Sequence, residues 1–124
     1  MNDLENIQRL TERFKRQMPN GEVYQKRLAE EFELILKQRF TEYFLKICDI
    51  IDITQDIKHM TRGSAGSSLV CYLLGITDVD PVKWNIPVAR FLNPLRDDLP
   101  DVDIDFEHWR QKDVMERIFK KWPG

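Results

Sequence analysis

The stretch Leu99-Pro100-Asp101-Val102-Asp103-Ile104-Asp105-Phe106 alternates three carboxylates with three apolar residues. A period of two is that of a strand, in which side chains at i, i+2 and i+4 share one face. The sequence therefore predicts a strand with its aspartates on one face and its apolar residues on the other. Repulsion among three carboxylates destabilises such a strand unless a cation or an arginine neutralises them. The pattern thus indicates a functional site as well as a structural strand.

Carboxylates on one strand face suit a hard divalent cation. Mg²⁺ prefers oxygen ligands and often keeps water and substrate phosphates as its remaining ligands. Two such ions about 3.5–4 Å apart clamp the attacking and leaving oxygens in phosphoryl transfer. A calcium-binding EF-hand loop is excluded, because Phe106 stands where its glycine is required and Lys112 where its final glutamate is required.

A second informative stretch, Thr61-Arg62-Gly63-Ser64-Ala65-Gly66-Ser67-Ser68, precedes a short apolar run that ends at Gly75. Small residues at the start of a helix allow close approach of the backbone, and free N–H groups at a helix start attract anions. Gly75 is the expected C-terminal stop of that helix. The stretch matches neither the P-loop pattern nor the dinucleotide-binding fingerprint. From these residues alone, a phosphate-binding loop and a simple helix-capping loop both remain open.

Basic residues lie between the two stretches. Arg90 and Arg96 flank a short apolar segment that ends a few residues before the aspartates. They either compensate the carboxylate charge or complete a phosphate site.

The remainder of the chain carries the apolar periodicity of helices. We expect helices over residues 2–18, capped by Asn2 or Asp3, over 22–38, after Thr41 as an N-cap, and over 108–122. In the helix over 22–38 the expected core stripe is Tyr24, Leu28, Phe32 and Ile35, and the residues expected on its other faces are Lys26, Arg27, Glu30, Glu31 and Glu33. Such stripes indicate core packing more often than a binding surface.

Composition limits the class of protein. The 124 residues are 42% hydrophobic and 32% charged, which is typical of one globular domain. A net charge of −2 argues against binding of nucleic acid through bulk basic charge. Cys48 and Cys71 lie in apolar runs without a C-x-x-C spacing or a signal peptide, which predicts buried thiols in a reducing cytoplasm. We expect no membrane association, since the apolar runs are too short to span a bilayer.

Four motifs in order resemble one family. Residues 62–70, 75–81, 90–96 and 100–106 follow one another at the spacing of the bacterial DNA polymerase III alpha subunits, the C-family replicative polymerases. The resemblance implies an α+β fold, a mostly helical fragment of a polymerase-beta-like nucleotidyltransferase palm with few strands. It also implies a single domain over 1–124, with a helical lead-in over 1–56 and a partial palm over 57–124 that contains the phosphate-binding loop and the aspartate strand.

The resemblance implies roles for individual positions. Asp101 and Asp103 match two metal-binding, catalytic aspartates, whereas Asp105 matches an acidic position that is not usually a ligand. The residues that match the family's binding site for the incoming nucleotide's triphosphate are Arg62, Gly63, Ser64, Gly66, Ser67 and Arg90. The implied reaction is attack of a primer 3′-hydroxyl on the α-phosphate, with Mg²⁺ or Mn²⁺ as cofactor. The implied partners are a deoxynucleoside triphosphate, primer–template DNA and the remaining polymerase domains.

The chain departs from the family's pattern at several positions. His59-Met60-Thr61 replaces the usual glycine-rich lead into the loop, Ala89 stands where an acidic residue is common, and Arg39 where a glycine is common. The family's third catalytic aspartate lies downstream of these residues, so we expect this chain alone to be inactive.

Two other interpretations stay open. One is a small non-enzymatic module, derived from that palm, that binds phosphate or a cation, and the other is a structural remnant. In an isolated palm fragment the apolar face of the aspartate strand has incomplete cover, and an unpaired strand edge recruits other strands. We therefore also expect a homo-oligomer, unless the N-terminal helices cover that face.

Overall fold

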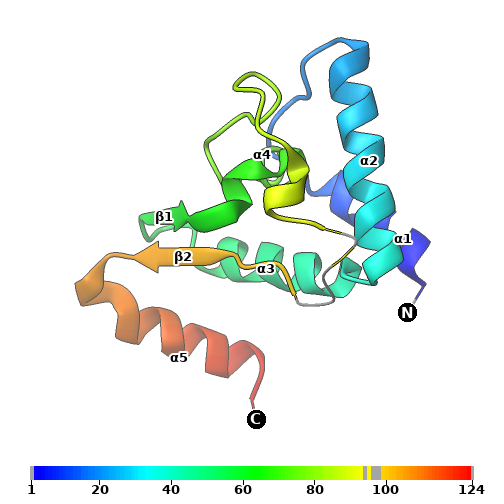
Figure 1. The fold of residues 1–124 in the computed structure, drawn as a ribbon. Helices are drawn as coiled ribbons and strands as arrows, with labels where there is room; N and C mark the ends of the chain where they lie inside the picture. Colours follow the sequence, from blue (N-terminus) through cyan, green and yellow to red (C-terminus); the bar gives the residue numbers. More distant parts are fainter. Residues whose placement is uncertain (1, 94, 96–98, 124) are drawn as a thin grey trace.

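The computed structural model describes residues 2–93, 95 and 99–123 of the 124-residue chain. In chain order the elements are α1 (Asp3–Glu12), α2 (Glu22–Gln38), α3 (Thr41–Ile53), β1 (His59–Arg62), the 3₁₀ helix η1 (Gly63–Ser67), α4 (Leu69–Leu73), the 3₁₀ helix η2 (Val88–Arg90), β2 (Asp103–Phe106), the 3₁₀ helix η3 (His108–Arg110) and α5 (Gln111–Lys121) (Figure 1). The expected α+β class with few strands is confirmed, because these residues form mostly helix and one two-stranded sheet. Among the described helices, none combines the length and apolar character needed to cross a membrane.

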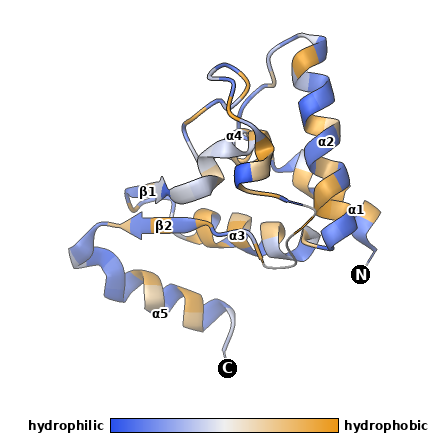
Figure 2. Ribbon diagram, in the orientation of Figure 1, coloured by the Kyte–Doolittle hydropathy of each residue, from blue (hydrophilic) through white to orange (hydrophobic). Residues whose placement is uncertain are grey.

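The core forms where the first four α-helices meet. Leu10 of α1, Ile35 of α2 and Phe44 of α3 are fully buried, and Val70 of α4 joins the same cluster. Figure 2 shows hydrophobic residues alternating with hydrophilic ones along α1, α2 and α3, as expected for amphipathic helices. Helix α2 has the predicted bounds, and Ile35 on its predicted stripe is buried. The apolar periodicity thus predicted the bounds of α2 and part of its packing face.

Helix α1 ends at Glu12, although the apolar periodicity predicted a helix to residue 18. The amides of Lys15 and Arg16 both donate to the carbonyl of Leu73 at the end of α4, at 2.7 and 3.1 Å. These tertiary hydrogen bonds replace helical ones, so the apolar spacing that includes Phe14 does not continue the helix.

The two predicted N-caps have different outcomes. Asn2 caps α1 as predicted, since its side chain accepts a hydrogen bond from the Leu4 amide at 2.8 Å. Thr41 is the first residue of α3 and does not cap it. Its buried hydroxyl donates to Asp3 at 2.8 Å and accepts from Nδ2 of Asn6 at 3.1 Å. The expected cap is therefore wrong, because this hydroxyl is used to join α3 to α1.

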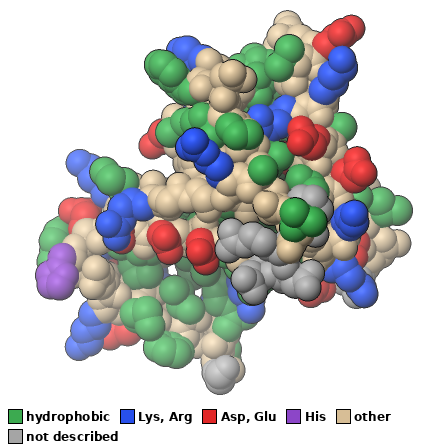
Figure 3. Space-filling view, in the orientation of Figure 1, with side chains coloured by type: hydrophobic (Ala, Val, Ile, Leu, Met, Phe, Trp, Pro, Cys, Tyr) green, Lys and Arg blue, Asp and Glu red, His purple; other side chains and the backbone are tan. Residues whose placement is uncertain are grey.

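The sheet pairs β1 and β2 antiparallel, with Arg62 opposite Asp103. Asp103 and Asp105 are exposed and Ile104 between them is half-buried, so the predicted alternation is confirmed. Asp101 is also exposed but precedes the strand. Figure 3 shows acidic side chains in a row over β2. The sheet therefore presents a solvent-facing acidic surface.

The opposite face of β2 packs toward the helices. Val102 and Ile104 contact the buried cluster, to which α1, α2 and α3 contribute residues. Both side chains are half-buried. The N-terminal helices thus supply part of the cover that was expected to be missing.

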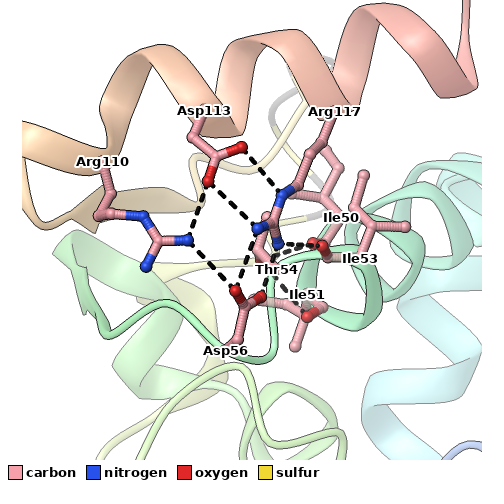
Figure 4. A network of polar contacts seen from close by, with 8 residues as sticks. All are labelled: Ile50, Ile51, Ile53, Thr54, Asp56, Arg110, Asp113 and Arg117. Atoms are coloured by element: carbon pink, nitrogen blue, oxygen red, sulfur yellow. Dashed lines mark hydrogen bonds and ion pairs between the residues drawn. The ribbon is translucent and has the colours of Figure 1, made fainter.

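A network of charged side chains fixes α5 to the end of α3 (Figure 4). The Arg117 guanidinium donates to both carboxylate oxygens of Asp56, at 2.6 and 3.0 Å, and to the carbonyl of Ile53 at 2.9 Å. Arg110 and Asp113 complete the network. The pKa of the Asp56 carboxyl is well below its usual value, mainly because Arg117 donates hydrogen bonds to it. The helix expected over 108–122 is present, with η3 as its first turn.

Candidate functional site

Strand β1 places Arg62 on the acidic face of β2. Arg62 Nε lies 2.5 Å from Asp105 Oδ2, and Nη2 donates to Oδ1 at 3.3 Å. This pair is largely exposed, so it adds little stability, but it compensates one of the carboxylate charges. Asp101 and Asp103 also present exposed side chains. Of the two neutralising groups that the sequence left open, a cation or an arginine, the structure thus shows an arginine at Asp105, and this residue is Arg62, whereas the sequence pattern suggested Arg90 or Arg96.

The backbone turns at Gly63, next to Asp103. Gly63 has a φ of +85°, which residues with a side chain rarely adopt. A Cβ at this position would lie 3.2 Å from Asp103 Oδ2. The loop backbone therefore lies close to the carboxylate that was predicted to be a metal ligand, and the positive φ of this turn favours glycine.

Gly63→Ala is expected to lower the free energy of unfolding by about 1–2 kcal/mol, because the positive φ and the nearby Asp103 carboxylate both disfavour a methyl group. Urea unfolding followed by circular dichroism measures the change. Gly66→Ala is the matched control, since its φ is not positive and its Cβ would meet no atom within 4 Å. We expect the control to be neutral or stabilising by up to about 1 kcal/mol. Equal effects of the two substitutions would contradict the role of Gly63.

A small cavity of about 30 Å³ brings together three predicted site residues from separate segments. Ser64 comes from η1, Arg90 from η2 and Asp101 from the segment before β2. The remaining wall is formed by Gln38, Phe91, Asn93, Leu99 and Pro100. A cavity of this size holds about one water-sized group, such as a single phosphate oxygen. The other predicted basic residue, Arg96, lies outside the described residues.

Tyr43 of α3 fixes the backbone before Asp101, a contact that the sequence pattern does not indicate. Its hydroxyl donates to the carbonyl of Pro100 at 2.6 Å. Burial raises the pKa of the Tyr43 phenol, so the hydroxyl keeps its proton at neutral pH. The helical core thus positions Asp101 through a direct hydrogen bond to its neighbour.

The last residue of η1, Ser67, and the following Ser68 face the protein interior. Ser67 is buried, and Ser68 caps α4 by accepting a hydrogen bond from the Cys71 amide at 3.1 Å. The Ser68 hydroxyl donates to Glu31 Oε1 at 2.8 Å. The structure therefore does not bring Ser67 to the cavity that contains Ser64.

The six predicted phosphate-binding residues fall into separate environments. A second cavity, of about 300 Å³, is bounded by β1, the loop glycines and residues 76–79. The six residues lie as follows: Arg62 on the acidic face, Ser64 and Arg90 at the smaller cavity, Gly63 and Gly66 at the larger one, and Ser67 buried.

The chain supplies its own anion to the start of α4. The carboxylate of Glu31 accepts hydrogen bonds from the amides of Leu69 and Val70, at 2.7 and 3.0 Å, and from the Ser68 hydroxyl. Nε of Arg27 donates to the same carboxylate at 2.9 Å. Glu31 is fully buried and the Arg27 side chain is largely buried, so the expected place of these two residues on outer faces of α2 is wrong. These donors offset the cost of burying a charge. The Glu31 carboxylate in turn occupies the start of α4, a position that was expected to attract an external anion.

Opposing influences act on the Glu31 carboxyl. Burial raises its pKa, while the amides of Val70 and Leu69, the Ser68 hydroxyl and Arg27 favour the ionised form. The neighbours that contact its oxygens all donate hydrogen bonds. This arrangement suits a carboxylate and not a carboxylic acid.

The carboxylate oxygens on the acidic face are suitable ligands for a hard cation that has few protein ligands. Asp101 and Asp103 offer exposed carboxylates, whereas Asp105 is paired with Arg62. Within the part of the chain that the structure describes, no three His, Cys, Asp or Glu side chains gather closely enough to hold a metal ion. Mg²⁺ is compatible with such a site, because it commonly keeps several waters and substrate phosphates as ligands.

Comparison with known proteins identifies a matching family model and similar bacterial DNA polymerases. A family model described as "Bacterial DNA polymerase III alpha NTPase domain" matches residues 4–123. The chain is 40% identical over 121 residues to the error-prone DNA polymerase of Pseudomonas syringae pv. tomato, which covers 94% of this chain and 12% of that protein. It is 43% identical over 106 residues to DNA polymerase III subunit alpha of Staphylococcus aureus (strain MRSA252), which covers 83% of this chain and 10% of that protein. The chain spans about a tenth of the length of the curated relatives it matches.

Proposed function

Because this chain belongs to the family of bacterial DNA polymerase III alpha subunits, we propose that it forms part of a polymerase-beta-like palm that adds nucleotides to a primer in DNA replication. The proposal rests on one juxtaposition. Asp103 lies against the backbone of Gly63, and Asp101 shares a cavity with Ser64 and Arg90. Carboxylates beside a small-residue loop and an arginine suit a complex of a divalent cation with a triphosphate.

The proposed reaction is attack of the primer 3′-oxygen on the α-phosphorus of a deoxynucleoside triphosphate. The new O–P bond forms as the bond to pyrophosphate breaks, and the hydroxyl proton passes to water. Asp101 and Asp103 hold the cation, while Arg90 and the Ser64 hydroxyl orient the phosphates. A bound Mg²⁺ or Mn²⁺ supplies the Lewis acidity that activates the attacking oxygen and stabilises the leaving one.

A non-enzymatic module that binds phosphate or a cation is the second candidate. Ser64, Arg90 and Asp101 line one cavity, and these groups can bind a phosphate and a hydrated cation without catalysing a reaction. Primer extension by the polymerase that contains this segment distinguishes the two candidates.

Manganese titration monitored by NMR tests the proposed metal site. We expect Mn²⁺ to broaden first the amide resonances of residues 101–103 and of Gly63, because the Asp101 and Asp103 carboxylates hold the ion. Asp103→Asn should weaken the apparent affinity by about tenfold or more. Asp105→Asn is the control on the same strand face, and it should retain the broadening, since Asp105 is engaged by Arg62. Equal broadening in both variants, centred elsewhere, would remove the site.

Partners and location follow from the same proposal. The partners are a deoxynucleoside triphosphate, primer–template DNA and the other polymerase domains, with residues 1–56 as a helical lead-in and 57–124 as a palm segment. We also propose a cytoplasmic location, because Cys48 and Cys71 are buried free thiols. Burial raises the pKa of the Cys48 thiol to about 11, which keeps it unreactive.

We further propose that the isolated chain self-associates. Strand β2 pairs with β1 on one side, and its other edge has no strand partner among the described residues. On the neighbouring η3 and α5, Trp109, Met115 and Phe119 are exposed. Free strand edges and exposed apolar side chains favour association. Light scattering coupled to size exclusion should give a mass above that of one chain at micromolar concentration, and a sharp monomer peak would contradict this expectation.

A further inference from the structure

One side of α2 contacts the segments that surround the candidate site. The Tyr24 hydroxyl donates to Asp80 Oδ2 at 2.6 Å, in the segment between α4 and η2. Nε2 of Gln38 donates to the carbonyl of Asn93 at 2.7 Å, just after η2. Arg27 lies between these two contacts on the same side of the helix. Polar side chains of α2 thus fix the chain on both sides of η2.

The guanidinium of Arg27 joins two backbone segments, the end of η1 and the segment before η2. Its Nη2 donates to the carbonyl of Ser67 at 2.7 Å and to the carbonyl of Ile86 at 2.6 Å. Its Nε donates to Glu31, as described above. The side chain is 13% exposed, so these hydrogen bonds are largely shielded from water. A single guanidinium therefore connects the end of η1 with the segment that enters η2.

We propose that Arg27 is a positioning residue that sets the spacing between the η1 loop and Arg90. Ser67 is the last residue of η1, and Ile86 precedes η2 by one proline, so the Arg27 bridge fixes both 3₁₀ helices. The two helices contribute Ser64 and Arg90 to one cavity. A shift of either segment changes the geometry at which these two side chains meet a phosphate. The ligand in this inference rests on the proposed function, whereas the spacing is a property of the fold.

Lysine cannot replace the arginine in this bridge. A guanidinium presents several donors in a fixed planar arrangement, whereas an ammonium is a compact point charge on a flexible stem. Arg27→Lys therefore keeps a cation beside Glu31 and loses the simultaneous bonds to the two carbonyls. The substitution separates the bridge from the buried ion pair.

Arg16→Lys is the matched control. Nε of Arg16 donates to the carbonyl of Tyr72 at 2.9 Å, and its Nη2 donates to the carbonyl of Thr77 at 3.1 Å. This arginine also joins two backbone segments through carbonyls, but neither Tyr72 nor Thr77 lines the cavity that contains Ser64. A general loss of stability should affect both variants in the same way.

The test uses NMR on the unsubstituted chain and on both variants. Nuclear Overhauser effects between η1 and η2 measure their spacing, and titration with dATP and Mg²⁺ measures nucleotide affinity through the shifts of Ser64 and Arg90. We expect Arg27→Lys to lose the η1–η2 effects and to bind dATP about tenfold more weakly. Arg16→Lys should retain both the effects and the affinity.

Retention of the η1–η2 effects in Arg27→Lys would overturn the proposal, as would an equal loss in Arg16→Lys. If Arg27→Lys does not fold, the unsubstituted chain still decides the question. Its Arg27 Hη2 signals should be resolved and show cross-peaks to Ser67 and Ile86, whereas a rotationally averaged signal would overturn the bridge. An unsubstituted chain that does not bind dATP would contradict the proposed function, while the spacing remains measurable.

Discussion

Replacement of Glu31 by alanine is expected to lower the free energy of unfolding by about 3–5 kcal/mol. The substitution removes the acceptor of the Leu69 and Val70 amides and of the Ser68 hydroxyl, which are buried. It also removes the carboxylate that pairs with Arg27. Each buried donor without an acceptor costs about 1–3 kcal/mol. Since domains are stable by about 5–15 kcal/mol in total, this variant should lose a large part of its stability.

Glu33→Ala is the control for this prediction. Glu33 lies on the same helix and is exposed, so its loss should change the free energy of unfolding by less than about 0.5 kcal/mol. Urea denaturation of the two variants, followed by circular dichroism, gives both values. A loss below about 1 kcal/mol for Glu31→Ala would show that its hydrogen bonds do not hold α4 in place.

Asp103→Asn is expected to slow nucleotide incorporation by about 10³-fold or more in a full-length polymerase subunit that contains this segment. The side chain is exposed, so the amide should leave the fold intact. A neutral amide is a weaker ligand for Mg²⁺ than a carboxylate, and the Lewis acidity of a bound ion contributes several kcal/mol of transition-state stabilisation. About 4 kcal/mol corresponds to a factor of 10³ in rate.

Single-turnover primer extension measures this rate, with Asp105→Asn as the control. Asp105 lies on the same exposed face of β2 but pairs with Arg62. Its substitution should change the rate by less than about tenfold, since exposed ion pairs contribute little. Equal losses for the two aspartates would contradict the assignment of Asp103 as a ligand and Asp105 as a charge partner.

The parts of the fold that depend on local sequence were predictable. The alternation over residues 101–106 predicted which face of β2 is exposed, and the apolar stripe predicted the bounds of α2. The end of α1 was not predictable in this way. It is determined by the carbonyl of Leu73, which accepts two amides from a segment far earlier in the chain. Periodicity contains no information on such a tertiary partner.

The candidate site was predictable only in part, because it too depends on tertiary contacts that the local sequence does not indicate. The resemblance implied that the Gly63–Ser64 loop and Asp103 serve one nucleotide site, but neither the approach of Gly63 to Asp103 nor the burial of Glu31 was predicted. The sequence did contain one sign that Glu31 is buried. Glu31 lies three residues after Leu28 and four before Ile35, on the apolar stripe of α2. A charge at a core position requires buried partners. The partner amide of Leu69 lies 38 residues away, so the sequence could indicate the requirement but not the donor.

Anomalous diffraction from crystals of this chain grown with Mn²⁺ and a non-hydrolysable deoxynucleoside triphosphate tests most directly whether β2 and η1 form a metal–triphosphate site. We predict an anomalous peak within ligand distance of the Asp101 and Asp103 carboxylates, with the phosphates beside Ser64 and Arg90. A peak coordinated elsewhere, with the triphosphate bound away from the Gly63–Ser64 loop, would contradict the proposed site.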